Sequence, residues 1–464
     1  MSERPLIPER PKAHAAIQVE RRKRAGEEVF FVLDPASPAW AVLNRHGRDV
    51  LARCDGTRSP EQISAAIARS YGVAQEEACV GTETFLGQMS ETRLLEKDRP
   101  PPREEGLPRR NRFHSLAIEV TRRCNLECRH CFLAAGEADP HELSLEQIKA
   151  IIRQVKGAGG TSVSLGGGEP LLRSDWVQIV RFALSQGLLV AIGSNGTLID
   201  ETLARTLAAL PIKIQISLDG ARPAGHDRIR GAGSFEAAME GIHHLISAGK
   251  LDDLVVAFTP MRPNIREVPA FVDLMLELGV TIVQFPPLAR SGRARRNWQA
   301  LRLSDAQRLW LWQYLSRRAG ELKGRMDILA DCLSIDIHNP GVPYRCSIGS
   351  QLRMDPRGDL YPCQCFHFGS EFRVGNVRKQ SLEQIVKGPR LKGIIEHCIA
   401  RPDLIPGCSG CRWRNFCGAG CMGNAYEATG EALSPDGCKV RKAWIERLFE
   451  ERAGVHDESG EALE

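Results

Sequence analysis

The sequence has 464 residues, of which 42% are hydrophobic and 26% are charged, and its formal net charge at pH 7 is +5. A chain of this length exceeds one ordinary core, so we expect two or three domains, and the small net charge without a long basic stripe argues against nucleic-acid binding. The sequence contains neither a run of 18 apolar residues nor the apolar segment of a signal peptide, and it therefore predicts a cytoplasmic protein that does not span a membrane.

Residues 1–98 are predicted to form one unit. Apolar segments separated by proline-containing turns predict a hairpin, and apolar positions at helical spacing predict two helices. The expected elements are strands at 29–33 and 40–43, a helix opened by Ser59-Pro60-Glu61, and a helix at 80–95. The stretch 99–112 is rich in proline and charge and is predicted to be a linker.

Residues 113–325 alternate between strand patterns and helix patterns. The expected strands are 116–121, 162–165, 188–192, 212–218, 254–259 and 281–285, and the expected helices include 145–155, 176–185, 201–209, 235–248 and 268–278. This alternation predicts an α/β fold with a parallel sheet and right-handed crossovers. Six units suffice for a partial (β/α)6 barrel similar to a TIM barrel, in which the chemistry lies at the C-terminal ends of the strands.

Cysteine is the residue type that stands out. Of the 15 cysteines, three lie within 124–131 and ten within 332–438. Cytosolic thiols stay reduced, so clustered cysteines predict metal ligands rather than disulfides. We expect residues 326–450, which are rich in Gly and Pro, to form a cysteine-rich domain cross-linked by metal clusters, and residues 451–464 to form a flexible tail.

The first barrel strand is expected to lead into Cys124, Cys128 and Cys131, which have the spacing C-x3-C-x2-C. Three thiolates leave one iron of a [4Fe–4S] cubane without a protein ligand. That iron can chelate the amino and carboxylate groups of S-adenosylmethionine (SAM), whose reductive cleavage releases a 5′-deoxyadenosyl radical. For this spacing taken alone, a zinc site or incidental thiols are the alternatives.

Glycines and polar residues follow the next expected strands, where a barrel binds its ligands. Each signal is weak alone, but together with the cysteine loop they resemble the radical SAM superfamily. The residues that this resemblance brings to SAM are Gly167, Gly168, Glu169, Pro170, Ser194, Asn195, Ser217, Asp219 and Arg230. It implies that the loop 167–170 holds the SAM amino group, that Ser194 and either Ser217 or Asp219 contact the ribose, and that Arg230 binds the carboxylate.

The C-terminal cysteines have the order of a SPASM domain, which this region resembles over about 100 residues. In that family seven cysteines hold two auxiliary iron–sulfur clusters. The resemblance implies a distal cluster bound by Cys408, Cys411, Cys417 and Cys438, and a proximal cluster bound by Cys346, Cys363 and Cys421. For the fourth proximal ligand we favour Cys365 over Cys332, and we expect Cys54, Cys79 and Cys398 to be buried apolar residues. A zinc ribbon is the alternative for such cysteine pairs.

Most of residues 25–97 resemble PqqD, a peptide chaperone with a winged helix–turn–helix fold that serves as a recognition element for ribosomally made peptides. The resemblance implies that a leader peptide binds by strand addition, and we expect the edge of the strand 40–43 to receive it. A pocket lined by Val42, Phe85 and Met89 is expected beside that edge, although these residues could equally be core. A structural or DNA-binding winged helix is the alternative.

The predicted function is maturation of a ribosomal precursor peptide by radical chemistry, with SAM, a [4Fe–4S] cluster and two auxiliary clusters as cofactors and a flavodoxin or ferredoxin as electron donor. Crosslinks, thioethers and related C–H functionalisation are the expected products. The alternative is a tetrapyrrole or metallocofactor maturase, because the segments 358–364 and 375–377 also resemble the haem-modifying SPASM enzymes. A non-enzymatic peptide adaptor is disfavoured by the intact cysteine loop.

Overall fold

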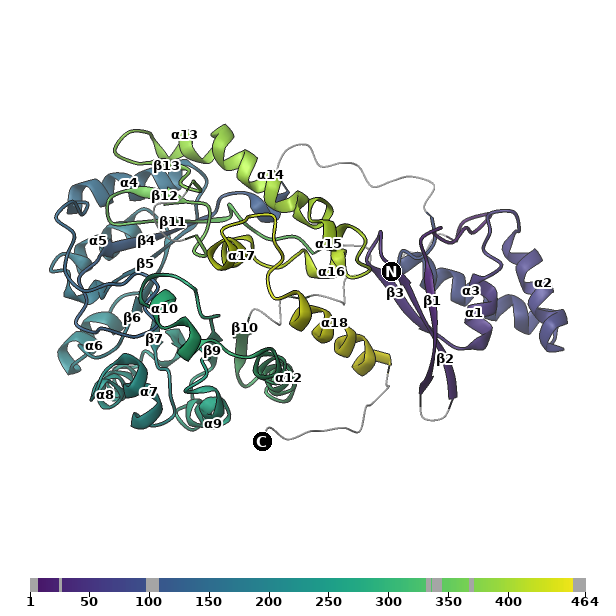
Figure 1. Cartoon of the computed structure of the whole chain (residues 1–464), viewed down its shortest axis with the longest axis horizontal. Helices are drawn as coiled ribbons and strands as arrows, with labels where there is room; N and C mark the ends of the chain where they lie inside the picture. The colour runs from purple at the N-terminus through teal and green to yellow at the C-terminus, as the bar shows by residue number, and fades with distance from the viewer. Residues whose placement is uncertain are drawn as a thin grey trace.

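The computed structural model describes residues 7–24, 27–96, 108–330, 335, 344–366 and 371–453. Cys332, most of the predicted linker 99–112 and most of the predicted tail 451–464 lie outside these ranges. An N-terminal unit lies at one end of the molecule, the barrel lies at the other, and the C-terminal helices lie between them (Figure 1).

The N-terminal unit consists of a three-stranded antiparallel sheet and three helices. These are β1 (Gln18–Arg24), β2 (Glu27–Asp34), β3 (Ala39–Leu43), α1 (Arg45–Leu51), α2 (Pro60–Tyr71) and α3 (Gln75–Glu91). The sheet order is β1-β2-β3, so β3 is an edge strand, as the leader-binding hypothesis requires. Ser59 starts α2 with a capping box, which is the start signal predicted from the sequence.

The two faces of this sheet bury different partners, because side chains alternate along a strand. Phe30 of β2 packs with the helices of the unit, where Phe85 and Met89 also lie. Phe31, the next residue, packs instead in the main core of the chain, where Val42 also lies. Val42 is therefore on the opposite face from Phe85 and Met89, and the three do not line one pocket.

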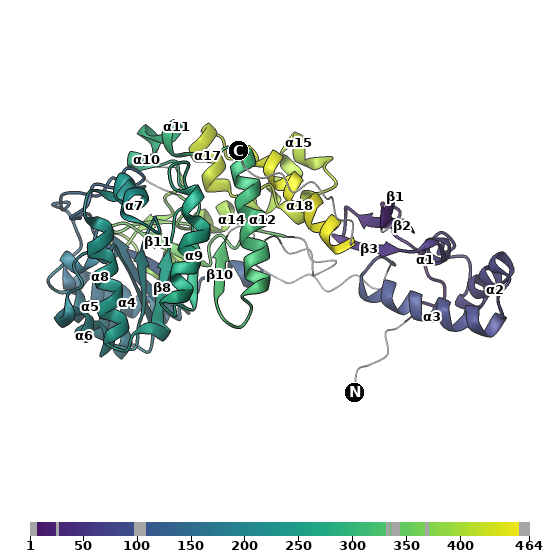
Figure 2. The same cartoon turned by 90° about the horizontal axis from the view of Figure 1, so that it is seen from below.

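The second face of the sheet docks on α18 (Cys438–Ala453), the last helix. Phe449 of α18 packs edge-on against Phe31 and Trp40, with ring centroids 5.1 and 4.9 Å apart. Trp413 stacks on the same Phe449 ring at 5.2 Å. This aromatic cluster joins the N-terminal unit to the cysteine-rich region, and Figure 2 shows the unit beside α18 and far from the barrel helices.

The predicted parallel sheet is confirmed. Its strands are β4 (Ser115–Thr121), β5 (Ser162–Gly167), β6 (Leu189–Ser194), β7 (Lys213–Ser217), β8 (Leu254–Ala257), β9 (Ile282–Phe285) and β10 (Asp327–Ala330). They are ordered consecutively from β4 to β10, and β4 does not pair with β10, so the barrel is open. The sheet continues through 327–330, past the boundary expected at residue 325.

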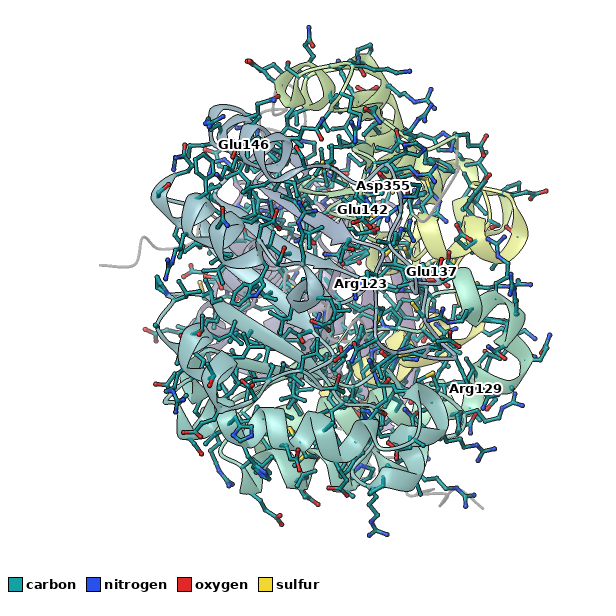
Figure 3. All side chains as sticks on the ribbon, turned by 90° about the vertical axis from the view of Figure 1, so that its left-hand side faces the viewer. Arg123, Arg129, Glu137, Glu142, Glu146 and Asp355 are labelled. Atoms are coloured by element: carbon teal, nitrogen blue, oxygen red, sulfur yellow. The ribbon has the colours of Figure 1, made fainter. Side chains whose placement is uncertain are left out.

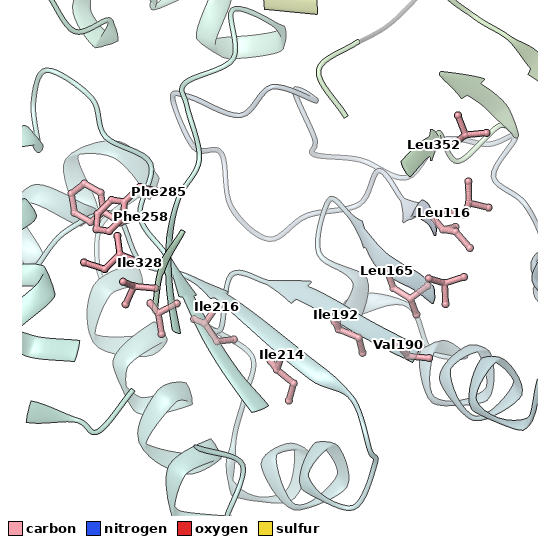
Figure 4. Packing of buried hydrophobic residues seen from close by; sticks show 14 of the residues in the cluster. Leu116, Leu165, Val190, Ile192, Ile214, Ile216, Phe258, Phe285, Ile328 and Leu352 are labelled. Carbon is pink, nitrogen blue, oxygen red and sulfur yellow. The ribbon is translucent and has the colours of Figure 1, made fainter. Parts of the chain in front are cut away.

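The helices that cover this sheet are α4 (Leu145–Gly157), α5 (Trp176–Ser185), α6 (Glu201–Ala208), α7 (Pro223–Arg230), α8 (Ser234–Ser247), α9 (Val268–Glu277) and α12 (Asp305–Glu321). In α4, Ser144 forms the capping box and apolar residues at helical spacing are buried. Leu116, Leu165, Ile192, Ile214 and Ile216 pack with them along one face of the sheet (Figure 4). This packing fixes the strand ends that carry the site.

The C-terminal region joins the barrel through the sheet itself. β11 (Gln351–Met354) pairs parallel to β4, and β12 (Asp359–Tyr361) and β13 (Gly375–Asn376) continue the sheet antiparallel. The helices that follow are α13 (Leu382–Val386), α14 (Pro389–Leu404), α15 (Pro406–Ser409), α16 (Arg414–Cys417) and α17 (Met422–Thr429). Among the described residues no helix is both long and apolar enough to cross a membrane.

Candidate active site

A cavity of about 480 Å³ opens at the C-terminal ends of the barrel strands. Cys124, Cys128 and Cys131 all line it, as do the glycines of the loop after β5. Of the other residues expected near SAM, Ser194, Asn195, Ser217 and Arg230 also line it, whereas Glu169, Pro170 and Asp219 do not. The fold thus gathers most of the predicted residues around one space.

The cysteine loop is held by backbone contacts at both ends. The Cys124 amide donates to the Gly136 carbonyl at 2.8 Å, and Arg293 donates to the carbonyls of Cys128 and Ala135 at 2.8 and 2.7 Å. The amides of Leu126 and Ala135 point at the sulfurs of Cys124 and Cys131 at 3.5 and 3.4 Å. Such N–H groups stabilise the thiolates that a cluster requires. Arg293, on α10 (Gly292–Arg296), was not predicted from the sequence.

Burial opposes ionisation of Cys124 and Cys128. Desolvation raises the pKa of Cys128 to about 11, and the nearby Arg230 guanidinium lowers it only in part. Burial likewise raises the pKa of Cys124. A cluster would supply the positive charge that keeps all three thiols deprotonated, since metal coordination removes the proton outright.

The loop after β5 requires glycine for two physical reasons. Gly167 has φ +119°, which side chains with a Cβ rarely adopt. A Cβ on Gly168 would lie 2.1 Å from the Arg123 carbonyl oxygen. The Gly168 and Glu169 amides in turn donate to the carbonyls of Thr121 and Arg123, both at 2.8 Å. The glycine loop therefore packs directly against the base of the cysteine loop.

Glu169 is fully buried and braces the end of β6. Its carboxylate accepts hydrogen bonds from the Ser194 hydroxyl at 2.9 Å, the Asn195 amide at 2.8 Å and the Leu171 amide at 3.1 Å. Desolvation nevertheless raises the pKa of Glu169 to about 7. Glu169 is thus placed to shape the loop after β6 through Ser194.

Hydrogen bonds between side chains link the loop after β6 to the cysteine loop. Asn195 donates to the Asn125 side chain at 2.8 Å, and Asn125 donates to the Thr197 hydroxyl at 2.8 Å. Sequence reasoning missed Asn125, although its place directly after Cys124 was a signal. This contact fixes two cavity walls relative to each other.

Arg230 reaches the cavity from α7 and is held by Asp219. The Arg230 Nε donates to Asp219 at 2.7 Å, and the Thr259 amide donates to the other carboxylate oxygen at 2.7 Å. His130 Nε2 lies 3.4 Å from Asp219, and the Asp219 amide donates to His226 at 3.0 Å. Asp219 is 0% exposed and does not line the cavity. It therefore acts on the site through Arg230.

The remaining wall combines β4, β7 and β9 with the C-terminal region. Glu119 of β4 forms a buried ion pair with Arg353 of β11, and the guanidinium also lies 4.3 Å from the centre of the Tyr361 ring. Desolvation raises the pKa of Glu119. Amide side chains complete this wall: Gln215, Gln284, Gln351 and Gln364. None of these residues was predicted, because they lie far apart in the sequence and come together only in the folded chain.

The C-terminal cysteines separate into two groups. The outer group is Cys408, Cys411, Cys417 and Cys438, in which desolvation and then the neighbouring thiols raise the pKa of Cys408 to about 11. The inner group is Cys346, Cys363, Cys365, Cys398 and Cys421. There the Cys365 thiol contacts the thiols of Cys363 and Cys421, and the Cys398 thiol contacts that of Cys346. Cys54 and Cys398 are buried as predicted, whereas Cys79 is only partly buried. Cys398 lies among thiols and not only among apolar side chains.

These donor sets fit iron–sulfur clusters. The barrel cavity presents three thiols beside open space, and each C-terminal group offers at least four. Among the described residues no three His, Cys, Asp or Glu side chains could hold a single metal ion. In an iron–sulfur cluster each thiolate binds a different iron and sulfide ions bridge the irons, so the cysteine sulfurs lie farther apart than around a single metal ion.

A larger cleft of about 1180 Å³ lies outside the barrel mouth and contains none of the cysteines. Charged side chains line much of it, and several pair across it, such as Arg357 with Asp139 at 2.7 Å. Figure 3 shows Glu137, Glu142 and Asp355 gathered near Arg123 in this part of the molecule. Because no cysteine lines this cleft, its larger size does not make it the reaction site.

Three family models match the chain. The radical SAM superfamily matches residues 118–275, the SPASM iron–sulfur cluster-binding domain matches 346–412, and coenzyme PQQ synthesis protein D matches 30–95. The chain is 30% identical over 320 residues to the mycofactocin maturase MftC of Mycolicibacterium smegmatis, covering 66% of this chain and 77% of MftC. The MftC of Mycobacterium ulcerans is 32% identical, over 66% of this chain and 82% of that protein.

Other similar proteins include an AdoMet-dependent heme synthase of Methanosarcina barkeri, 27% identical over 69% of this chain and 94% of that protein. Among solved structures, Streptococcus suis SuiB bound to S-adenosylmethionine matches with a TM-score of 0.57 and 14% identity, over 91% of this chain and 98% of SuiB. The structure of anSMEcpe with AdoMet and the Cp18Cys peptide matches with a TM-score of 0.59 and 18% identity, over 73% of this chain and 97% of that chain. At these identities the structural matches support the fold.

The family models and the MftC relatives agree with the three parts of the fold and with the cysteine loop at the barrel mouth. The cofactors that follow are SAM, a SAM-binding [4Fe–4S] cluster and auxiliary iron–sulfur clusters. The chain belongs to the radical SAM superfamily, as an enzyme with a C-terminal SPASM domain and an N-terminal PqqD domain.

Proposed function

We propose that this enzyme modifies a ribosomally made precursor peptide that it holds by its leader. The observation that carries the proposal is the PqqD domain, whose sheet docks on the SPASM helix α18 through Phe31, Trp40 and Phe449. A peptide-binding unit is thereby built into the same body as the radical SAM cavity. The similarity to the maturase MftC and the fold shared with SuiB, which was solved bound to its precursor peptide SuiA, support this class of substrate.

Some of the cavity residues would bind the cofactors and others would bind the substrate. Cys124, Cys128 and Cys131 would hold the [4Fe–4S] cluster, which together with bound SAM supplies a 5′-deoxyadenosyl radical. Arg230, oriented by Asp219, would bind the SAM carboxylate, and the backbone around Gly167 and Gly168 would receive its amino group. Ser194, Asn195 and Ser217 would contact the ribose.

The substrate would meet the wall formed by Glu119, Arg353 and the glutamine side chains. Amide groups both donate and accept hydrogen bonds, so they suit peptide backbone, whose own groups are amides. Small residues line the other side of the cavity, where SAM would lie: Ala117, Ser164, Ala191 and Gly193. We infer that β9 and β11 face the peptide, that β5 and β6 receive the cofactor, and that β4 and β7 contribute residues to both sides.

The auxiliary clusters would occupy the two C-terminal cysteine groups. The outer group supplies four thiolates, and the inner cluster would use Cys346, Cys363 and Cys421 together with Cys365, whose thiol contacts two of the three. Three clusters imply roughly 10–12 irons per chain, depending on the nuclearity of the inner one. A flavodoxin or ferredoxin would deliver the electron in the cytoplasm, where free thiols stay reduced.

The leader would pair with the free edge of β3. An edge strand presents unpaired N–H and C=O groups, and strand addition uses them for affinity. The turn between β2 and β3 is fixed on the SPASM domain, since the Asn415 side chain donates to the carbonyls of Pro35 and Ala36 at 2.7 and 3.0 Å. A leader bound at β3 would thus lie beside the cluster domain.

A second candidate function is maturation of a tetrapyrrole. The observation that favours it is the similarity to AdoMet-dependent heme synthase over 94% of that protein. A PqqD-type domain has no evident part in such a reaction. Mass spectrometry of a short peptide encoded beside this gene, after co-expression with the enzyme, separates the two.

The test of the radical mechanism replaces Cys124, Cys128 and Cys131 by Ala together. We expect the variant to form no 5′-deoxyadenosine with dithionite and to leave the co-expressed peptide unmodified, while it retains the iron of the auxiliary clusters. Cys79→Ala, at a cysteine far from the cavity, is the control. Formation of 5′-deoxyadenosine by the triple variant would refute the assignment.

A further inference from the structure

Arg401 is a buried cation that forms no ion pair with a carboxylate among the described residues. It lies on α14 and is 0% exposed. Its guanidinium donates to the carbonyls of Ala432, Gly420 and Ser434 at 2.9, 3.0 and 2.5 Å. None of these partners carries a charge, and no ion pair joins Arg401 to a carboxylate within the described part of the chain.

A buried charge with only neutral partners is costly, so proteins normally pair it with an opposite charge or leave it near solvent. Arg401 does neither, and its three hydrogen bonds give each guanidinium nitrogen one partner without neutralising the ion. An anionic group that binds at this place would supply the missing negative charge.

The neighbours of Arg401 belong to both C-terminal cysteine groups. Gly420, which accepts one of its hydrogen bonds, directly precedes Cys421 of the inner group. Cys398 of the inner group lies three residues before Arg401 on α14. The Arg401 carbonyl accepts from the Ile405 amide at 3.0 Å, and the Ile405 carbonyl accepts from the amide of Cys408 in the outer group at 2.8 Å. α14 thus carries this cation between the two groups.

An iron–sulfur cluster bound by thiolates is an anion, and its reduction adds a further negative charge. The reduction potential of such a cluster depends on the charges and hydrogen bonds around it. A fixed cation nearby favours the reduced state, since it stabilises the added electron in a medium of low dielectric.

We infer that Arg401 is the shared counter-cation of the two auxiliary clusters and that it raises the reduction potentials of both. It acts as a positioning and redox-tuning residue, because it reaches the irons only through space and through the backbone before Cys421. The inference rests on the proposed ligand groups, and it adds an electrostatic coupling between them.

The test measures the midpoint potentials of the auxiliary clusters in Arg401→Gln and Arg401→Lys, each made in the background in which Cys124, Cys128 and Cys131 are Ala. Gln keeps hydrogen-bond donors without the charge, and Lys keeps the charge without the planar fork. Arg390→Gln is the matched control, because Arg390 also lies on α14 and also donates to backbone carbonyls, those of Glu371 and Arg373, but is exposed. Iron content is determined first, and the potentials follow from redox titration monitored by electron paramagnetic resonance.

We expect Arg401→Gln to shift both auxiliary potentials to more negative values, Arg401→Lys to retain most of the wild-type values, and Arg390→Gln to change neither. Loss of iron from Arg401→Gln with full iron in Arg401→Lys also supports the inference, since the charge is then the required property. Unchanged potentials in a fully loaded Arg401→Gln protein, or equal loss of iron from both Arg401 variants, would overturn it. Wild-type protein with only about 4 irons would instead refute the auxiliary clusters themselves.

Discussion

At the scale of single residues, the site is built from pairs in which one member faces the cavity and the other holds it. Arg230 lines the cavity and forms an ion pair with Asp219 behind it. Ser194 also lines the cavity, and its hydroxyl donates to Glu169. Such second partners are fully buried, so their charge acts at short range and with little screening. Their substitution should change cofactor binding without removing any group that touches the cofactor.

Asp219→Asn tests this arrangement. The amide cannot neutralise the Arg230 guanidinium, so we expect its orientation to relax and the dissociation constant for SAM to rise roughly 10- to 100-fold. Equilibrium binding to reconstituted protein measures the effect, and the thermal midpoint reports on folding. Asp227→Asn is the control, because Asp227 caps the start of α8 through the Phe235 amide and does not contact Arg230. Equal SAM affinity in Asp219→Asn and wild type would contradict the role.

The candidates for the fourth ligand of the inner cluster are Cys365, Cys398 and Cys332, of which Cys332 lies outside the described residues. Cys365 contacts two of the three other proposed ligands, whereas Cys398 contacts Cys346 alone. We therefore expect Cys365→Ser to change the spectrum of one auxiliary cluster and Cys398→Ser to leave it as in wild type. Electron paramagnetic resonance and Mössbauer spectra of both variants give the answer, and the reverse result would transfer the role to Cys398.

At the scale of elements, α18 connects two functions. It begins at Cys438, a proposed ligand of the outer cluster, and three turns later it presents Phe449 to the sheet of the PqqD domain. The Arg22 side chain of β1 also reaches Glu450 at 3.5 Å. One rigid helix therefore carries both the outer cysteine group and the docking surface of the peptide-binding domain.

Phe449→Ala should weaken this docking. Removal of a buried phenylalanine ring costs roughly 3–5 kcal/mol, and here the loss falls on the interface with Phe31 and Trp40. We expect faster hydrogen exchange in β2 and β3 and unchanged exchange in the barrel strands. Leu433→Ala, which removes an exposed side chain of the same domain, is the control. Exchange rates in β2 and β3 equal to those of wild type would show that the cluster does not hold the domain.

At the scale of the whole molecule, the chain places peptide capture, auxiliary clusters and radical chemistry along one line. The PqqD domain contacts the SPASM domain, and the SPASM domain shares a sheet with the barrel through β11 and β4. The buried pair of Glu119 and Arg353 crosses that junction inside the cavity wall. The wall that we propose to face the substrate is thus made by two domains together.

Removal of residues 1–98 tests the division of labour. We expect the truncated enzyme to cleave SAM without modifying the peptide, since the barrel cavity contains no residue from the removed part. Products are counted by mass spectrometry, and iron content must equal that of the full chain, because the truncation exposes Phe449 beside the outer cysteine group. A truncated enzyme that modifies the peptide at the rate of the full chain would refute leader capture by the PqqD domain.

The sequence by itself determined the features that are local in the chain. The spacing of Cys124, Cys128 and Cys131, the glycines after the second barrel strand and the alternation of strands with helices each depend on residues within a few turns of one another. The predicted parallel sheet and the three parts of the chain followed from such patterns. A hydrophobic period of two or 3.6 residues indicates a strand or a helix, and a ligand spacing indicates a metal site, without reference to distant parts of the chain.

Only the tertiary structure decided which residues meet across the fold. Arg353 and Glu119 are 234 positions apart, and their pairing depends on the register of β11 beside β4. The same holds for Val42, which the strand alternation turns toward Phe449, away from the expected pocket. Arg401 gives no sequence signal at all, because its isolation from carboxylates is a property of the space around it. Contacts between distant segments are set by packing and sheet register, which no local pattern encodes.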